Sequence, residues 1–285
     1  MTTPETLAVI PEDEASGETA RIYAEIRETL GIVNLIWRHM ATFDGALQWA
    51  WSALGPVYSS GAVTAGADDL RTSARSLLQP IEPVPEEVLR CIGLSSDDCC
   101  AIAEIVGSYE LGNAANLIAT NALLQRVAAM PGPTEVAGSA KPVAAARKHE
   151  SRSMYRILPI AELDASTAAL VGRLNELCCT HDRPILVSIY RHLGHWPAFL
   201  ALAWTQIAPL AATNHLAECS LKIKCLGNEK ASHLADLLHP TGRHPAGEKA
   251  LGIFLERIGF PRMVAITAVH AQSLALVGSR QKRQR

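Results

Sequence analysis

The chain has 285 residues, a formal net charge of −2 and 48% hydrophobic residues. This length suffices for two lobes of ordinary domain size, and the balanced charge leaves no broad basic surface, which disfavours a nucleic-acid partner. Aromatic residues make up only 5% of the chain, whereas Ala and Leu are abundant, a composition that favours helix over sheet. No convincing alternating strand pattern occurs, so we predict an all-α fold.

The first part of the chain reads as a short lead-in followed by amphipathic helices. Residues 1–15 are polar, and the first helix is predicted to begin near Ser16 and to end at Gly31. The following helices are expected over residues 34–41, from an Asp44 cap to a point before Pro56, over residues 67–79, and in a short segment that ends at Ile92.

Two helices are predicted next, with a break between them. The sequence from Ser95 to Asp98 is a strong signal for a helix start. We expect this helix to end at Gly112 and another to open with Asn113 and Asn116, running to about residue 129. Residues 131–160 are rich in Pro, Gly, Ala and Lys and are interpreted as a linker between two lobes.

The second part of the chain has matching signals. Asp164 is expected to cap its first helix, and Asp182 to cap a helix that begins at Arg183–Pro184. A pair of helices over residues 248–259 and 260–276 completes this part, and the basic tail 277–285 is predicted to be disordered.

These two parts contain similar sequences at a spacing of 153 residues. The first copy reads NLIWRHMATFDGALQWAWSALGP and the second reads SIYRHLGHWPAFLALAWTQIAP. Without a gap, Arg38 and Trp51 align with Arg191 and Trp204. A period this long indicates a duplicated domain, with lobes at residues 16–130 and 161–276. The second copy differs in having an acid, Asp182, shortly before it.

Cysteine usage indicates a reducing compartment. The number of cysteines is odd at seven, two pairs are adjacent in sequence, and the chain is long enough to need no disulfides. The N-terminus is acidic and lacks the hydrophobic region of a signal peptide. The longest apolar run, residues 196–213, contains two prolines and reads as a buried helix rather than a membrane span. We therefore expect a cytoplasmic protein without a membrane partner.

Asp182 has two interpretations. As a helix cap, its carboxylate would accept backbone N–H groups and become a weaker base. As a general base, it would be ionised at neutral pH and able to take a proton from water. Asn113 and Asn116 present the same choice, because each amide could cap a helix or hold a water or substrate. Phe260 aligns with Asn113 in the other copy, so we expect the two lobes to supply a polar and an apolar wall to a shared cleft.

The cysteine-rich stretch before Asp182 is a poor metal site. Cys178, Cys179, His181 and Asp182 lack a second pair of ligands at the usual spacing, and adjacent cysteines rarely bind one tetrahedral ion. We expect the two cysteines to be small buried side chains, although a thiol-dependent enzyme that uses Cys178 or Cys179 is an open alternative.

The motifs together resemble the group I 2-haloacid dehalogenases, an all-helical family. The resemblance covers about residues 16–275 and rests on the repeat, on NLIWRHMA, on GNAAN at residues 112–116, and on HDRP at residues 181–184. It implies two tandem helical repeats packed as a pseudo-dimer about a pseudo-two-fold axis, with the active site between them. It further implies hydrolysis of short 2-haloalkanoic acids to 2-hydroxy acids without a cofactor or metal, and a homodimer is among the expected assemblies.

The resemblance also assigns roles to individual residues. Asp182 would activate a water that attacks C2 directly and inverts it, and Asn113 would help to hold that water. The substrate-binding residues would be Trp37, Thr180, His181, Phe260 and Asn116. Thr180 occupies the position at which the family has Ala in members that accept both enantiomers and Asn in D-specific members, so the enantiomer preference is left open. The alternative function is a catalytically silent helical homologue that binds a small carboxylate or a protein partner.

Overall fold

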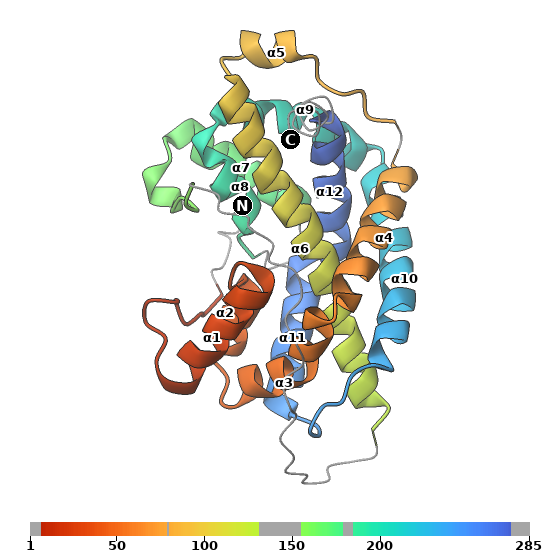
Figure 1. The fold of residues 1–285 in the computed structure, drawn as a ribbon. Coiled ribbons are helices and arrows are strands. Elements are labelled where there is room, and N and C mark those ends of the chain that lie inside the picture. The colour runs from red at the N-terminus through yellow and green to blue at the C-terminus, as the bar shows by residue number, and fades with distance from the viewer. Residues whose placement is uncertain (1–6, 79, 131–154, 179–184, 275–285) are drawn as a thin grey trace.

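The computed structural model describes residues 7–78, 80–130, 155–178 and 185–274. Every regular element in these ranges is helical, which confirms the predicted all-α class (Figure 1). The first half contains α1 (Gly17–Leu30), α2 (Leu35–Met40), α3 (Ala46–Ser59), α4 (Ala62–Leu77), α5 (Glu86–Cys91) and α6 (Ser96–Ala128). The second half contains η1 (Ile160–Glu162), α7 (Ala165–Cys178), α8 (Ser188–His192), η2 (Leu193–His195), α9 (Pro197–Ala212), α10 (His215–Ala235), α11 (Pro245–Ile258) and α12 (Phe260–Ser273).

Several helix boundaries follow from the capping signals in the sequence. Ser95 and Asp98 form a reciprocal capping box at the start of α6, with bonds of 2.9 and 3.1 Å between side chains and backbone N–H groups. Asp164 accepts the backbone N–H groups of Ser166 and Thr167, the second and third residues of α7, at 3.0 Å and so starts this helix. At the end of α1, Gly31 adopts a left-handed φ of 77° and donates its N–H to the last turn.

Other boundaries differ from the sequence prediction. The expected break at Gly112 is wrong, because α6 runs without interruption through Asn113 to Ala128. A single glycine in a helix interior costs only about 1 kcal/mol relative to alanine, which is too little to end the element. Pro56 lies inside α3 rather than beyond it, and α3 starts after Gly45 instead of an Asp44 cap.

The helix expected to begin at Arg183–Pro184 does not continue into the described residues. Residues 185–187 are not helical, and α8 begins only at Ser188, with the extended Val187 as its N-cap residue. Asp182, the expected cap of that helix, lies outside the described residues.

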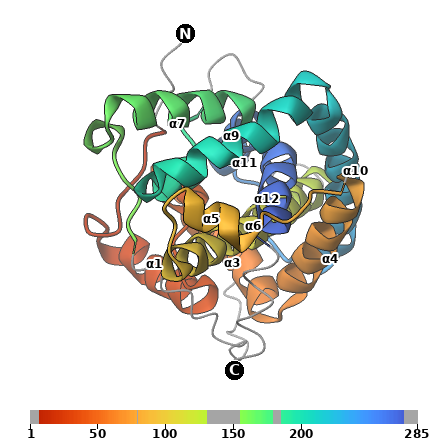
Figure 2. The same ribbon diagram turned by 90° about the horizontal axis from the view of Figure 1, so that it is seen from above.

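The long helix α6 forms the centre of the molecule. Helices α4, α10 and α12 pack along it, while α1–α3 and α7–α9 lie further out (Figures 1 and 2). The contact between α6 and α10 is close: a Cβ on Gly227 would lie 2.8 Å from the side chain of Leu117. A larger residue at this position would push the two helices apart.

A buried ion cluster joins α4 to α6. The carboxylate of Glu110 is completely buried and accepts hydrogen bonds from the guanidinium groups of Arg71 and Arg75 at 2.6–3.1 Å. Hydrogen bonding to Glu110 raises the pKa of Arg75. Because both carboxylate oxygens are occupied, Glu110 has little capacity left to pair with other cations.

The segments that precede α2 and α8 are bonded in the same way. The N–H of Ile10 donates to the carbonyl oxygen of Arg38 at 3.0 Å, and the N–H of Leu158 donates to that of Arg191 at 3.3 Å. The histidine after each arginine also bonds a carbonyl group of the same preceding segment, at 2.8 and 2.7 Å. His39 is buried and His192 is partly buried, and both rings are thus held by a backbone carbonyl group. In the described ranges, no helix is both long enough and apolar enough to cross a membrane.

Candidate active site

The two asparagines singled out in the sequence lie in the middle of α6. Asn113 and Asn116 are both buried, each 8% exposed. They are more than ten residues from either end of the helix, so neither is a cap and this interpretation is wrong. The side-chain Nδ2 of Asn113 is buried and has no hydrogen-bond partner among the described residues. A buried amide donor without a partner costs free energy, which makes this position a candidate for binding a water or ligand.

Trp37 projects from α2 into an aromatic cluster. Its ring meets Trp51 edge-on with a centroid distance of 5.3 Å and Tyr58 at 6.2 Å. The indole N–H of Trp51 donates to Glu25 at 3.0 Å, whereas the Nε1 of Trp37 is buried without a partner in the described part of the chain. The two indoles, which the sequence analysis treated separately, thus pack together, and the N–H of Trp37 has no acceptor among the described residues.

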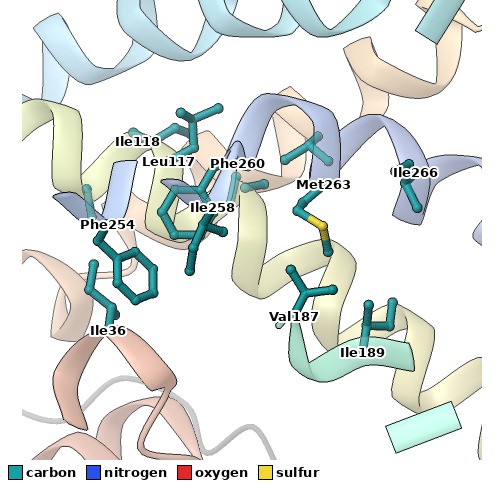
Figure 3. Close-up of a cluster of buried hydrophobic side chains, with 14 of the residues drawn as sticks. Ile36, Leu117, Ile118, Val187, Ile189, Phe254, Ile258, Phe260, Met263 and Ile266 are labelled. Atoms are coloured by element: carbon teal, nitrogen blue, oxygen red, sulfur yellow. The ribbon is translucent and has the colours of Figure 1, made fainter. Parts of the chain in front are cut away.

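Phe260 is the first residue of α12 and belongs to an apolar cluster. It follows Gly259, whose φ is 64°, and its ring lies 5.4 Å from that of Phe254. Figure 3 shows this cluster, in which side chains from α2, α6, α8, α11 and α12 meet. The labelled members are Ile36, Leu117, Ile118, Val187, Ile189, Phe254, Ile258, Phe260, Met263 and Ile266. Phe260 is therefore part of the buried apolar core.

Three of the predicted site residues, Thr180, His181 and Asp182, lie outside the described residues. The end of α7, which directly precedes them, contacts the start of α12. The carbonyl oxygen of Leu177 accepts a hydrogen bond from the Arg262 side chain. A Cβ on Gly259 would lie 3.2 Å from the carbonyl oxygen of Cys178. The described chain that precedes residue 179 is thus anchored against the helix that carries Phe260.

The thiol alternative finds little support in the described cysteines. Cys178 is completely buried, and its thiol donates to the carbonyl oxygen of Leu174 at 3.3 Å. Burial also raises the pKa of the Cys99 and Cys219 thiols, which disfavours the reactive thiolate. Cys179 lies outside the described residues. Among the described side chains, no group of three or more His, Cys, Asp or Glu is placed to hold a metal ion.

One polar feature near these residues was missed by the sequence analysis. Arg38 and Arg191, used there only as markers of the repeat, each have a buried Nε without a hydrogen-bond partner in the described ranges. Both guanidinium groups act electrostatically on the phenol of Tyr109, which lies one turn before Asn113 on α6. The signal available in the sequence was the alignment of an Arg with an Arg, which does not reveal whether either one has a counterion.

Comparisons with known proteins agree with the predicted resemblance. No family model matches the sequence. The chain is 24% identical over 217 residues, 72% of its length, to a Pseudomonas putida protein named (R)-2-haloacid dehalogenase, and covers 68% of that protein. This similarity confirms the resemblance to the 2-haloacid dehalogenases.

Solved structures show the same fold. A D-2-haloacid dehalogenase in complex with L-LA aligns over 96% of this chain and 98% of its own, with a TM-score of 0.75 and 18% identity. A mutant of a D-2-haloacid dehalogenase in complex with D-2-CPA aligns over the same shares, with a TM-score of 0.71 and 17% identity. At these identities the structural likeness establishes the shared helical fold.

Proposed function

We propose that this protein is a 2-haloacid dehalogenase that hydrolyses short 2-haloalkanoic acids to 2-hydroxy acids. The observation that carries the proposal is the sequence similarity over 217 residues to the (R)-2-haloacid dehalogenase. The shared fold over nearly the whole chain supports it. Because a fold alone hosts many activities, the residues that would perform the chemistry must also be argued individually.

In the proposed mechanism, Asp182 acts as a general base on a water molecule. The activated water attacks C2 directly and displaces the halide with inversion, and no ester with the enzyme is formed. Asn113 would hold this water with its amide. Two observations support that role: the side chain is buried, and its Nδ2 has no partner among the described residues. Fixing one water in line with the carbon–halogen bond converts a diffuse encounter into an oriented one.

The remaining proposed contacts would position the substrate. Trp37 and Phe260 would surround the halogen and exclude bulk water, in keeping with their buried aromatic environments. Asn116, one turn after Asn113, would add a polar contact, and Thr180 and His181 would contact the substrate beside Asp182. A tight apolar site of this kind strengthens the electrostatic interactions within it.

We further propose that the fold is a tandem repeat, with lobes at residues 16–130 and 161–276 packed as a pseudo-dimer. The equivalent bonds at the Arg38 and Arg191 carbonyl groups support this, as does the equal length of α1 and α7, 14 residues each. The proposal requires that a superposition of Trp51 on Trp204 also brings Arg38 onto Arg191. A superposition that leaves the two arginines on different faces would contradict it.

The function is tested by measuring halide release from both enantiomers of 2-chloropropionate, with chiral analysis of the product. We expect a 2-hydroxy acid of inverted configuration from at least one enantiomer. Chloride release without inversion would reject direct attack by water. Absence of release from any short 2-haloacid, with the protein folded, would reject the enzyme and favour a silent homologue that binds a small carboxylate.

A further inference from the structure

Two arginines from distant parts of the chain lie around one tyrosine. Arg38 belongs to α2 and Arg191 to α8, and the Nε of each is buried without a hydrogen-bond partner in the described ranges. Burial raises the pKa of Tyr109, and the positive charges of Arg191 and Arg38 oppose that rise. Burial lowers the pKa of Arg191, and Arg38 shifts it in the same direction. The positive charge of Arg38 thus disfavours that of Arg191.

This arrangement lacks a counterion among the described side chains. None of the ion pairs in the described ranges includes Arg38 or Arg191. Glu110 directly follows Tyr109 on α6, but its two oxygens are occupied by other arginines. Buried charges in proteins are normally paired, because removing an ion from water is costly. Two partly buried like charges without an acid are stabilised when an anion binds between them.

The arginine pair lies beside the proposed active site. Tyr109 and Asn113 are four residues apart on α6, which places their Cβ atoms about 5–6 Å apart on one helix face. Arg38 directly follows Trp37. The ring of His192, the residue after Arg191, lies 5.9 Å from that of Tyr109, which places this part of α8 against the same stretch of α6.

We propose that Arg38 and Arg191 together form a binding site for a monocarboxylate, one guanidinium group coming from each half of the chain. This inference rests on the proposed function: the carboxylate bound here would be that of the 2-haloacid substrate. A carboxylate has two oxygens with four acceptor positions, and each guanidinium group offers a planar fork of donors that matches them. Substrate held in this way would direct its halogen-bearing carbon toward Asn113 and the apolar cluster.

Binding is tested first without catalysis, by calorimetry on the full chain with propionate and with its neutral isostere, propionamide. We expect propionate to bind and propionamide to bind at least tenfold more weakly. Arg38→Met and Arg191→Met should each weaken propionate binding at least tenfold. The matched control is Arg243→Met, which removes an exposed arginine paired with Glu248 and should leave binding unchanged. Equal binding of the two ligands, or unchanged binding in both variants, would overturn the proposal.

Chloride distinguishes a carboxylate site from a halide site. A site shaped for two oxygens should bind propionate more tightly than chloride at the same ionic strength. If chloride displaces propionate at lower concentration, the pair is a halide site and the carboxylate assignment fails. Arg38→Lys and Arg191→Lys keep the charge but lose the fork, so we expect intermediate weakening. These variants also provide the test if a methionine variant does not fold.

Kinetics separate this inference from the proposed function. With a 2-haloacid substrate, the lysine variants should raise KM at least tenfold more than they lower kcat. An unchanged KM in an active enzyme would reject the arginine site while the dehalogenase activity stands. Conversely, a wild-type protein that releases no halide but binds propionate through both arginines would reject the activity and retain the site.

Discussion

The side-chain oxygen of Asn175 accepts a hydrogen bond from the backbone N–H of Val187 at 2.8 Å, twelve residues further along the chain. Both residues are buried, and the bond joins the last turns of α7 to the residue that precedes α8. The bond therefore fixes the distance between the segment that precedes Asp182 and the segment that follows it. A single neutral hydrogen bond thus joins α7 to the residue that precedes α8.

Replacement of this asparagine should affect both stability and activity. Asn175→Ala leaves the N–H of Val187 buried without an acceptor, which we expect to lower the free energy of unfolding by about 1–3 kcal/mol. Halide release should fall as well, at a temperature where the variant is still folded. The partly exposed Asn121 on α6 provides the control, since Asn121→Ala should change neither quantity appreciably. Full activity in Asn175→Ala would show that the bond does not position the segment.

Substitution of Asn113 should have the opposite effect on stability. Because its Nδ2 is buried without a partner in the described ranges, Asn113→Leu removes a desolvated polar group while nearly preserving volume. We expect an unchanged or higher melting temperature together with a loss of halide release of about 10²-fold or more, caused by misplacement of the water. Thermal unfolding and initial rates on the same preparation check this. A destabilised variant with a normal kcat would show that Asn113 contributes to packing and not to catalysis.

Asp182→Asn should abolish halide release without unfolding the protein. Loss of a general base typically costs about 10²–10⁴-fold in rate, and the same group here also positions the nucleophile. Asn is nearly isosteric, so circular dichroism and the melting temperature should match the wild type. Activity within tenfold of wild type would eliminate Asp182 as the base.

The route of the oxygen atom tests direct attack by water. In a single turnover in labelled water with excess enzyme, the first product should contain solvent oxygen. An ester intermediate would instead place a protein oxygen in that product and leave the label in an enzyme carboxylate. Mass spectrometry of product and protein distinguishes the two, and label in the protein rejects the proposed mechanism.

His270 should make the protein less stable in acid. Burial lowers the pKa of His270 to about 4, and its Nε2 lies 3.3 Å from the hydroxyl of Tyr190. In an unfolded chain the ordinary value is about 6.5, so between these pH values only the unfolded state binds the proton. The free energy of unfolding should therefore fall as the pH decreases through this window, by up to about 1.4 kcal/mol per pH unit from this group.

The contribution of His270 is isolated by comparing two variants. His270→Gln cannot bind a proton and should flatten the pH dependence of the free energy of unfolding between pH 4.5 and about 6. His239→Gln removes an exposed histidine and should leave the slope as in the wild type. Denaturant titrations at several pH values measure these slopes. Equal slopes in the wild type and in His270→Gln would show that a group other than His270 causes the loss of stability in acid.

Local signals in the sequence were sufficient for the fold class and for several helix ends. Ser95, Asp164 and Gly31 act through bonds to backbone groups within a few residues, so their effect is visible in a short window of sequence. The resemblance to the 2-haloacid dehalogenases could also be predicted, because it rests on residue identities. The sequence therefore determined the architecture in outline and the class of relatives.

Only the tertiary structure decided how the candidate site is built. Gly112 and Asn113 read locally as a helix break, yet packing against α10 and α12 keeps α6 continuous, because burial of its faces outweighs the propensity of one glycine. Whether a buried donor or cation has a partner depends on chain segments far apart in sequence. Among the described residues, the lack of a hydrogen-bond partner for Asn113 Nδ2 and for the Nε atoms of Arg38 and Arg191 became evident only when α2, α6 and α8 were placed together.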